Sequence, residues 1–128
     1  MVGLVIVTHS ATLAQGVAEL VRGLPGLPVP LAVAGGLDLP ERPLGTDAYR
    51  VQTAIAQVYS EDGVIVLMDL GSAVLSAEMA RDGFPPEQRG RIVLCEAPLV
   101  EGAVAAAVQA QIGGSLAQVA GAARTALE

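Results

Sequence analysis

The sequence predicts an α/β fold, a three-layer open sheet that is mainly parallel and carries helices on both faces. Runs rich in Val, Leu and Ile alternate along the chain with amphipathic, Ala-rich segments. Parallel strands need helical crossovers between them, so this alternation favours a parallel sheet. The composition is 52% hydrophobic but only 2% aromatic, and a core of small aliphatic side chains is typical of strands buried on both faces.

Four segments have the composition of strands, namely residues 2–7, 29–34, 64–68 and 91–95. The first and third are unbroken aliphatic runs, which indicates central strands. Pro28 and Pro30 remove backbone donors around the second, which places it at an edge of the sheet. The fourth ends on Cys95, the only cysteine, which we expect to be a buried small hydrophobe rather than a reactive thiol.

Capping residues and apolar positions at helical spacing predict five helices. The candidate N-caps of the first three are Ser10, Thr46 or Asp47, and Ser72, and two Ala-rich helices are expected over 99–112 and 115–127. The apolar positions assigned to the core faces of the first three helices are Leu13, Val17, Leu20 and Val21; Val51, Ile55 and Val58; and Leu75, Met79 and Ala80.

The charge of the chain excludes several classes of function. The net charge is −6, and the seven basic residues are scattered arginines with no lysine among them, so the chain lacks the basic surface that nucleic acids require. No apolar run approaches the ~20 residues of a membrane span, and the first residues lack the basic stretch and cleavage site of a secretory signal. We therefore expect a cytoplasmic protein with a single domain over residues 1–128.

Polar side chains end two of the expected strands. His9, the only histidine, follows the first strand, and Asp69 follows the third. If the strand order is 2-1-3-4, these strands are neighbours at the point where the order reverses, which is where open parallel sheets bind ligands. A carboxylate beside an imidazole fixes its tautomer and leaves the other ring nitrogen as a nucleophile. His9 and Asp69 are therefore the predicted catalytic pair, and which nitrogen reacts stays open.

Neighbours of this pair are candidates for holding a phosphoryl group. Two helices are expected to begin at this edge of the sheet, and the free N–H groups at their N-termini suit a phosphate. Glycines let the backbone approach an anion closely, and hydroxyl groups donate hydrogen bonds. The candidate phosphate-binding residues are Ser10, Gly71, Ser72, Thr8, Gly36 and Thr46. Together they predict a histidine that accepts and donates a phosphoryl group, with no metal or cofactor.

Other chemistries fit these residues less well. A dinucleotide site wants G-x-G-x-x-G after the first strand, where this chain reads THSATL, and a P-loop needs a lysine that the chain lacks. A receiver-type phosphoacceptor aspartate also usually works with a lysine. One histidine and one cysteine do not make a metal-ligand set. A Ser–His–Asp hydrolase would need the G-x-S-x-G elbow, which is absent.

The chain contains the segments LVIVTHSATLAQGVAELV, AGGLDLPERPLGTDAYRVQTAI, GVIVLMDLGSAVLSAEMA and APLVEGAVAAAV. Together these resemble the phosphotransfer subunits of phosphotransferase-system-dependent dihydroxyacetone kinases, whose phosphoacceptor domain is related to mannose-type IIA domains. The resemblance covers essentially the whole chain and implies a flavodoxin-like open sheet and a homodimer. Mannose-type relatives also exchange a late strand between subunits, but residues 98–128 read as helix and offer no run for it.

The resemblance implies that His9 is the phosphorylated histidine and that Asp69 orients it. HPr, a small phosphocarrier charged from phosphoenolpyruvate by enzyme I, would phosphorylate His9, and the group would pass to ADP on the nucleotide-binding kinase subunit. The regenerated ATP would phosphorylate dihydroxyacetone on a third subunit, making the chain a component of phosphoenolpyruvate–glycerone phosphotransferase in glycerol metabolism. Some members carry fused HPr-like and enzyme-I-like domains. This chain ends after the first domain, so we expect a separate carrier.

Two alternative functions stay open. A IIA component of a mannose-type sugar phosphotransferase system would use the same chemistry with a different destination, although the DLGSA motif favours the kinase. A regulatory binding module would hold its phosphoryl group and use it only to dock on a transcription factor. Turnover distinguishes this module from a relay, because a relay loses its phosphoryl group on the catalytic timescale.

Overall fold

The computed structural model describes residues 1–128 and contains one four-stranded sheet. Its strands are β1 (Gly3–Thr8), β2 (Leu31–Gly35), β3 (Val64–Met68) and β4 (Ile92–Cys95). They pair in parallel throughout, in the order β2-β1-β3-β4. This confirms the expected strand order and places the proline-flanked strand at an edge.

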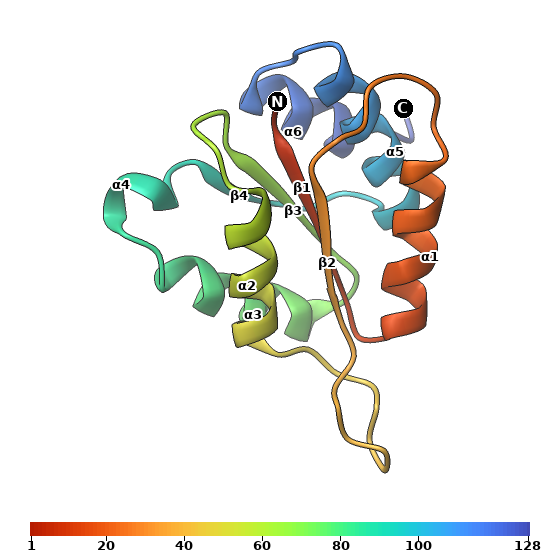
Figure 1. Ribbon diagram of the computed structural model, residues 1–128, viewed down its shortest axis with the longest axis vertical. Coiled ribbons are helices and arrows are strands. Elements are labelled where there is room, and N and C mark those ends of the chain that lie inside the picture. Colours follow the sequence, from red (N-terminus) through yellow and green to blue (C-terminus); the bar gives the residue numbers. More distant parts are fainter.

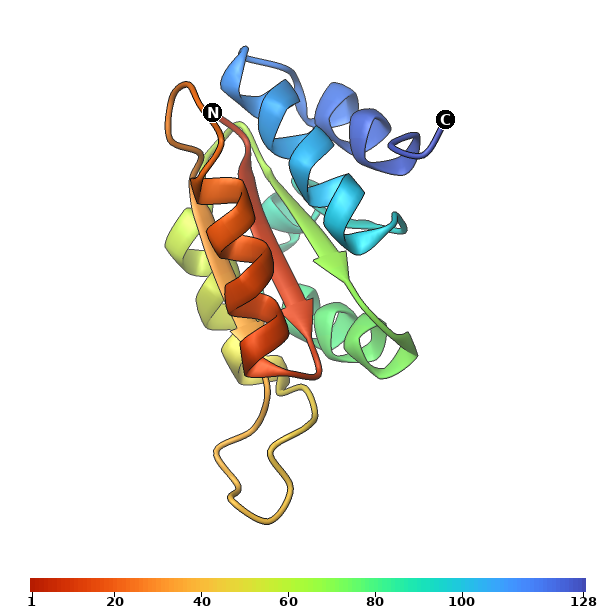
Figure 2. The same cartoon turned by 90° about the vertical axis from the view of Figure 1, so that its right-hand side faces the viewer.

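Helices cover both faces of the sheet (Figure 1). One face carries α1 (Ala11–Arg22), α5 (Leu99–Gln111) and α6 (Leu116–Arg124), and the other carries α2 (Ala48–Val58) and α3 (Gly71–Asp82). Figure 2 shows α1 and α5 side by side in front of the sheet. A short helix that the sequence did not predict, α4 (Pro86–Arg89), joins α3 to β4. None of the helices combines the length and the hydropathy that a membrane span needs.

The two central strands supply side chains to both layers of the core. Leu4 and Ile6 of β1 pack with α1, α5 and α6, whereas Val5 and Val7 pack with α2 and α3. All four side chains are fully buried. Strict alternation along a strand sends successive side chains to opposite faces, which explains why this strand has no polar position before its end.

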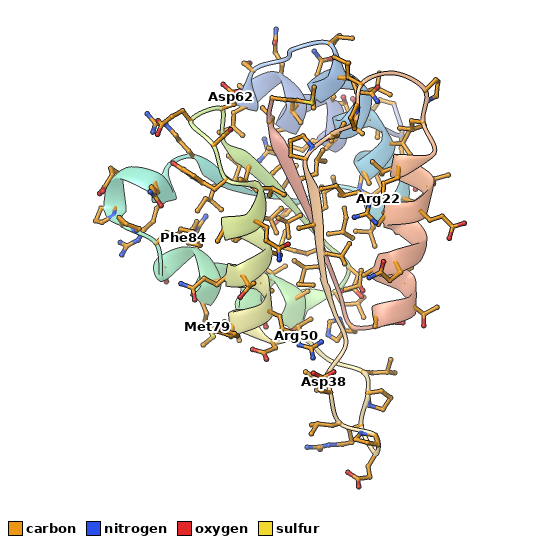
Figure 3. All side chains as sticks on the ribbon, viewed as in Figure 1. Arg22, Asp38, Arg50, Asp62, Met79 and Phe84 are labelled. Atoms are coloured by element: carbon orange, nitrogen blue, oxygen red, sulfur yellow. The ribbon has the colours of Figure 1, made fainter.

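The faces that two helices bury match those expected only in part, since Val17, Val21 and Ala80 are buried as predicted but the larger side chains are not. Leu13 and Leu20 of α1 and Leu75 and Met79 of α3 are between 41% and 61% exposed, and Figure 3 marks Met79 on the outside of the molecule. The positions that face the sheet are mainly alanines, including Ala14 and Ala18 of α1 and Ala73, Ala77 and Ala80 of α3. Small side chains let a helix approach the sheet closely, so here the leucines and Met79 lie on the flank and not in the core.

The sheet and α2 approach each other closely at Gly3. A Cβ added to Gly3 would lie 2.6 Å from the carbonyl oxygen of Val58, which is backbone and cannot turn away. By contrast, a Cβ at Gly16 on α1 would meet nothing within 4 Å. The same Gly→Ala change should therefore have opposite effects at the two positions.

We predict that Gly3→Ala lowers the free energy of unfolding by about 2 kcal/mol, because overpacking forces the backbone to shift. Gly16→Ala should raise it by up to about 1 kcal/mol, since alanine is the better helix former. Urea denaturation of both variants checks this. A Gly3→Ala protein as stable as the parent would contradict the close approach of β1 and α2.

Cys95 lies in the core as expected, with 1% of its surface exposed. Its Sγ donates a weak hydrogen bond to the carbonyl oxygen of Ala120, and burial raises the pKa of its thiol.

The thiolate is the reactive form of Cys95, so we predict that the folded protein reacts with a thiol reagent far more slowly than the protein in denaturant. Comparing the two labelling rates at pH 8 tests this, and equal rates would show that Cys95 is accessible.

Candidate functional site

The pairing of β1 with β3 brings His9 and Asp69 together. Val7 is opposite Met68 in the register, and the N–H of Asp69 donates to the carbonyl oxygen of Val7 at 3.2 Å. The register therefore sets Asp69 beside Thr8, one residue before His9. The backbone N–H of His9 donates to Asp69 Oδ2 at 2.9 Å, and His9 Nδ1 lies 2.9 Å from Asp69 Oδ1. The predicted proximity of these two side chains is confirmed.

This contact orients the imidazole. An ionised carboxylate only accepts hydrogen bonds, so Nδ1 directs its N–H at Asp69, and Nε2 is the ring nitrogen left for reaction. Partial burial raises the pKa of Asp69, but hydrogen bonds from the backbone and side chain of His9 and from the N–H of Leu70 outweigh it and hold that pKa below its usual value. The carboxylate stays ionised, and the ring stays oriented.

The free nitrogen faces the first turn of α3. Nε2 of His9 is in hydrogen-bond contact with the hydroxyl of Ser72. The sequence prediction that Ser72 is the N-cap of α3 is wrong, because Ser72 is the second residue of this helix. Leu70 occupies the cap position, and no side chain caps the helix. The N–H groups of Gly71 and Ser72 consequently have no acceptor in the protein, and the space around Gly71 is open.

Three other candidates support the backbone and do not face Nε2. Ser10 is the N-cap of α1, as predicted, and its hydroxyl accepts a hydrogen bond from the N–H of Leu13 at 3.2 Å. Thr8 is fully buried and donates its hydroxyl to the carbonyl oxygen of Ser10, so this hydroxyl is turned away from the site. Gly36 has a φ of 75° and packs against the N-terminus of α1 at Ala11.

Thr46 lies at the end of the loop that joins β2 to α2, which extends beyond the carboxyl edge of the sheet (Figure 2). Asp47, the other candidate, is the N-cap of α2. The hydroxyl of Thr46 lies 2.7 Å from that of Ser76 on α3, so it is turned to this helix and not to Nε2. Sequence reasoning missed Ser76, although its spacing of four from Ser72 puts both serines on one helix face.

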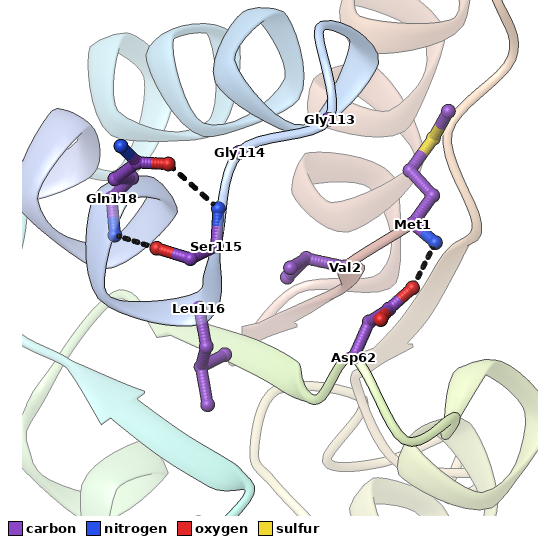
Figure 4. A pocket seen from close by; sticks show the side chains of 8 residues that line it. All are labelled: Met1, Val2, Asp62, Gly113, Gly114, Ser115, Leu116 and Gln118. Carbon is purple, nitrogen blue, oxygen red and sulfur yellow. Dashed lines mark hydrogen bonds and ion pairs between the residues drawn. The ribbon is translucent and has the colours of Figure 1, made fainter.

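A pocket of about 380 Å³ lies at the opposite edge of the sheet, around Val2 (Figure 4). Its polar groups are already paired with one another. The Met1 ammonium group pairs with Asp62, and Ser115 and Gln118 form a reciprocal capping box at the start of α6. No three His, Cys, Asp or Glu side chains converge anywhere in the chain as a metal site would require. The charged groups that line this pocket are therefore occupied by each other.

A parallel open sheet with a carboxylate-paired histidine at its switch point, facing free N–H groups of a helix N-terminus, suits phosphoryl transfer. Residues 3–120 match the family model described as "PTS system fructose IIA component" (EIIA-man). The chain belongs to this family, as the resemblance of its motifs led us to expect.

Two relatives of the chain are named as subunits of a dihydroxyacetone kinase. The chain is 48% identical over 120 residues to the "PEP-dependent dihydroxyacetone kinase, phosphoryl donor subunit DhaM" of Escherichia coli K12, covering 93% of this chain but 25% of that protein. It thus spans about a quarter of that relative. Over 115 residues it is 34% identical to the "PEP-dependent dihydroxyacetone kinase 2, phosphoryl donor subunit DhaM" of Listeria innocua, covering 90% of each.

A solved structure supports the fold independently. The "crystal structure of unknown function protein EF1359" superposes with a TM-score of 0.85 and 31% identity, over 98% of this chain and 95% of that one. The α/β architecture derived from the sequence therefore recurs nearly end to end in a related protein.

The lowered pKa of Asp69 predicts a pH dependence. A carboxyl group whose pKa is lower in the folded than in the unfolded protein stabilises the fold at pH values above its unfolded pKa, and this contribution is lost as the pH falls through the folded pKa. The free energy of unfolding of the wild type minus that of Asp69→Asn should therefore be largest near neutral pH and shrink below about pH 4. Urea denaturation at several pH values measures this, and a difference that grows on acidification would contradict it.

Proposed function

We propose that the chain is a phosphohistidine relay that serves as the phosphoryl donor of a dihydroxyacetone kinase. One observation carries the proposal: His9 presents Nε2 to the uncapped N-terminus of α3 while Asp69 occupies Nδ1. This arrangement prepares one nitrogen to attack phosphorus and surrounds it with donors for the phosphoryl oxygens. The names of the relatives supply the destination.

In the acceptance step, Nε2 of His9 attacks the phosphorus of a phosphohistidine on the carrier. An Nε2–P bond forms as the carrier's N–P bond breaks, and the carrier's nitrogen leaves with the electron pair. Because Nδ1 keeps its proton, the phosphorylated ring of His9 is cationic, and the Asp69 carboxylate at 2.9 Å stabilises it. Positioning and charge stabilisation are the main requirements of phosphoryl transfer, and this pair supplies both.

The N-terminus of α3 would bind the transferred group. The hydroxyl of Ser72 contacts Nε2 in the unphosphorylated protein and would turn to donate to a phosphoryl oxygen once the nitrogen is occupied. The N–H groups of Gly71 and Ser72, together with the positive end of the helix dipole, supply further donors. Ser10 and Gly36 would act indirectly, by shaping the turn that carries His9.

In the donation step, a terminal phosphate oxygen of ADP attacks the phosphorus, and the Nε2–P bond breaks with its electron pair returning to the ring. We infer that the donor is an HPr-like carrier, charged from phosphoenolpyruvate, and that the acceptor ADP is on the nucleotide-binding kinase subunit. The dihydroxyacetone-binding subunit would receive the group from the regenerated ATP. The homodimer, the single-domain organisation and the cytoplasmic location expected from the sequence stay predictions.

The test is an intact-mass measurement after incubation with phosphoenolpyruvate, enzyme I and HPr, followed by a chase with ADP-loaded kinase subunits. We expect one phosphoryl group to be gained and then lost during the chase. His9→Ala should gain none, since the chain has no other histidine. An adduct on His9→Ala, or no adduct on the wild type, would refute the relay.

Two variants separate the role of Asp69 from a general loss of negative charge. Asp69→Ala should slow phosphoryl acceptance at least tenfold, because the ring loses both its orientation and its counter-charge. Asp82→Ala removes an exposed carboxylate at the far end of α3 and should leave the rate unchanged. An adduct that is stable to the kinase would support the alternative functions: discharge by a sugar permease would indicate the IIA component, and a phosphoryl group retained on His9 would indicate the regulatory module.

A further inference from the structure

Gly45 and Thr46 connect two parts of the site that are far apart in sequence. The N–H of Gly45 donates to the carbonyl oxygen of His9 at 2.8 Å. The hydroxyl of Thr46 lies 2.7 Å from the hydroxyl of Ser76 and 3.4 Å from the carbonyl oxygen of Ser72. Two consecutive residues of one loop are therefore bonded to the histidine on one side and to α3 on the other.

This bridge bears on the position of Ser72. The first turn of α3 has no side-chain cap, so its own sequence does not hold its end in place. Ser72 and Ser76 lie one turn apart on the same face, and both are bonded to Thr46. Contacts from the side thus take the place of a cap and fix the distance between the Ser72 hydroxyl and Nε2 of His9.

The loop is itself held firmly enough to serve as an anchor. At its end, Asp47 caps α2 by accepting from the N–H of Tyr49 at 2.9 Å. Gly36 and Asp38, at the start of the loop, are both bonded to Arg50 of α2. Arg50 pairs with the carboxylate of Asp38 (Figure 3) and donates to the carbonyl oxygen of Gly36 at 3.4 Å. Both Thr46 and Ser76 are half-buried, which shields their hydrogen bond from water.

We propose that Thr46 and Ser76 are positioning residues for phosphoryl transfer, acting through Ser72. The inference rests on the proposed function of His9. The hydroxyl of Thr46 donates to the carbonyl oxygen of Ser72 and shares a hydrogen bond with the hydroxyl of Ser76, and neither side chain is hydrogen-bonded to Nε2 of His9. Without this pair the first turn of α3 moves relative to the imidazole, and its donors no longer meet the phosphoryl oxygens in line.

The experiment compares Thr46→Val with Thr53→Val. Both changes remove a threonine hydroxyl at constant shape, but Thr53 is exposed on α2 and bonds only to the carbonyl oxygen of Tyr49. Phosphoryl acceptance is measured over a range of HPr concentrations. For Thr46→Val we expect the rate at saturating carrier to fall about five- to tenfold, the loss typical of one hydrogen bond, with an unchanged KM. Thr53→Val should match the wild type.

Conservative and paired variants test the route through Ser76. Thr46→Ser keeps the hydroxyl and should recover most of the rate. Ser76→Ala breaks only the bond that Ser76 shares with Thr46, so it should lose no more than Thr46→Val, and the double variant should lose no more than Thr46→Val alone. Full additivity of the two losses, or no recovery with serine, would overturn the proposal.

A second readout separates this proposal from the function of the site. The ring nitrogens of His9, the only histidine, are observed by long-range ¹H–¹⁵N NMR without any carrier. Thr46→Val should shift the Nε2 signal as the Ser72 contact loosens, and Thr53→Val should not. If the wild type accepts no phosphoryl group, the proposed function fails, and an Nε2 shift confined to Thr46→Val still supports the positioning. If Thr46→Val changes neither the Nε2 signal nor the rates, the positioning role is overturned. A raised KM with an unchanged rate at saturating carrier also overturns it, because it would assign Thr46 to carrier docking instead.

Discussion

The hydrogen-bond ladder between β1 and β3 is the constraint on which the rest of the site depends. Its register sets Val7 opposite Met68, and the N–H of Asp69 extends it by one further bond. A slip of one residue would send every side chain of the strand to the other face of the sheet. Both faces are buried here, so the core itself prevents such a slip and keeps the carboxylate opposite the imidazole. The geometry of the reacting group is thus set by aliphatic packing far from it.

The sequence was sufficient for the sheet and for the catalytic pair, because both depend on patterns with a single physical solution. Short, β-branched aliphatic runs bounded by turn residues are typical of strands buried on both faces, and the switch point of the resulting strand order lies between the strands that precede His9 and Asp69. The helix faces were harder to predict. In α1 and α3 leucine and alanine both recur at helical spacing, and hydropathy alone assigns the larger side chain to the core, whereas close packing against the sheet selects the alanine.

The polar details of the site depend on where helices begin, which a sequence determines to within a residue or two. Serine is a common N-cap residue, yet α3 starts before Ser72 and leaves its hydroxyl inside the first turn, where it reaches the imidazole of His9. Thr8 was a candidate for phosphate binding because of its hydroxyl, yet the pleat of β1 points this side chain inward. Ser76 was missed because its partner, Thr46, comes from a loop 30 residues away in sequence. Local patterns do not reveal such long-range pairs.

The anchored loop between β2 and α2 divides into parts with different freedom to change. Its two ends are tied to His9, α3 and Arg50, whereas the tip, with Glu41, Arg42 and Leu44, is exposed. Lengthening a flexible loop has a small entropic effect, about 0.6 kcal/mol for each doubling. Insertions or substitutions at the tip would therefore leave the histidine undisturbed. Natural variation or protein engineering can alter what the molecule presents to its surroundings there, independently of the chemistry a few residues away.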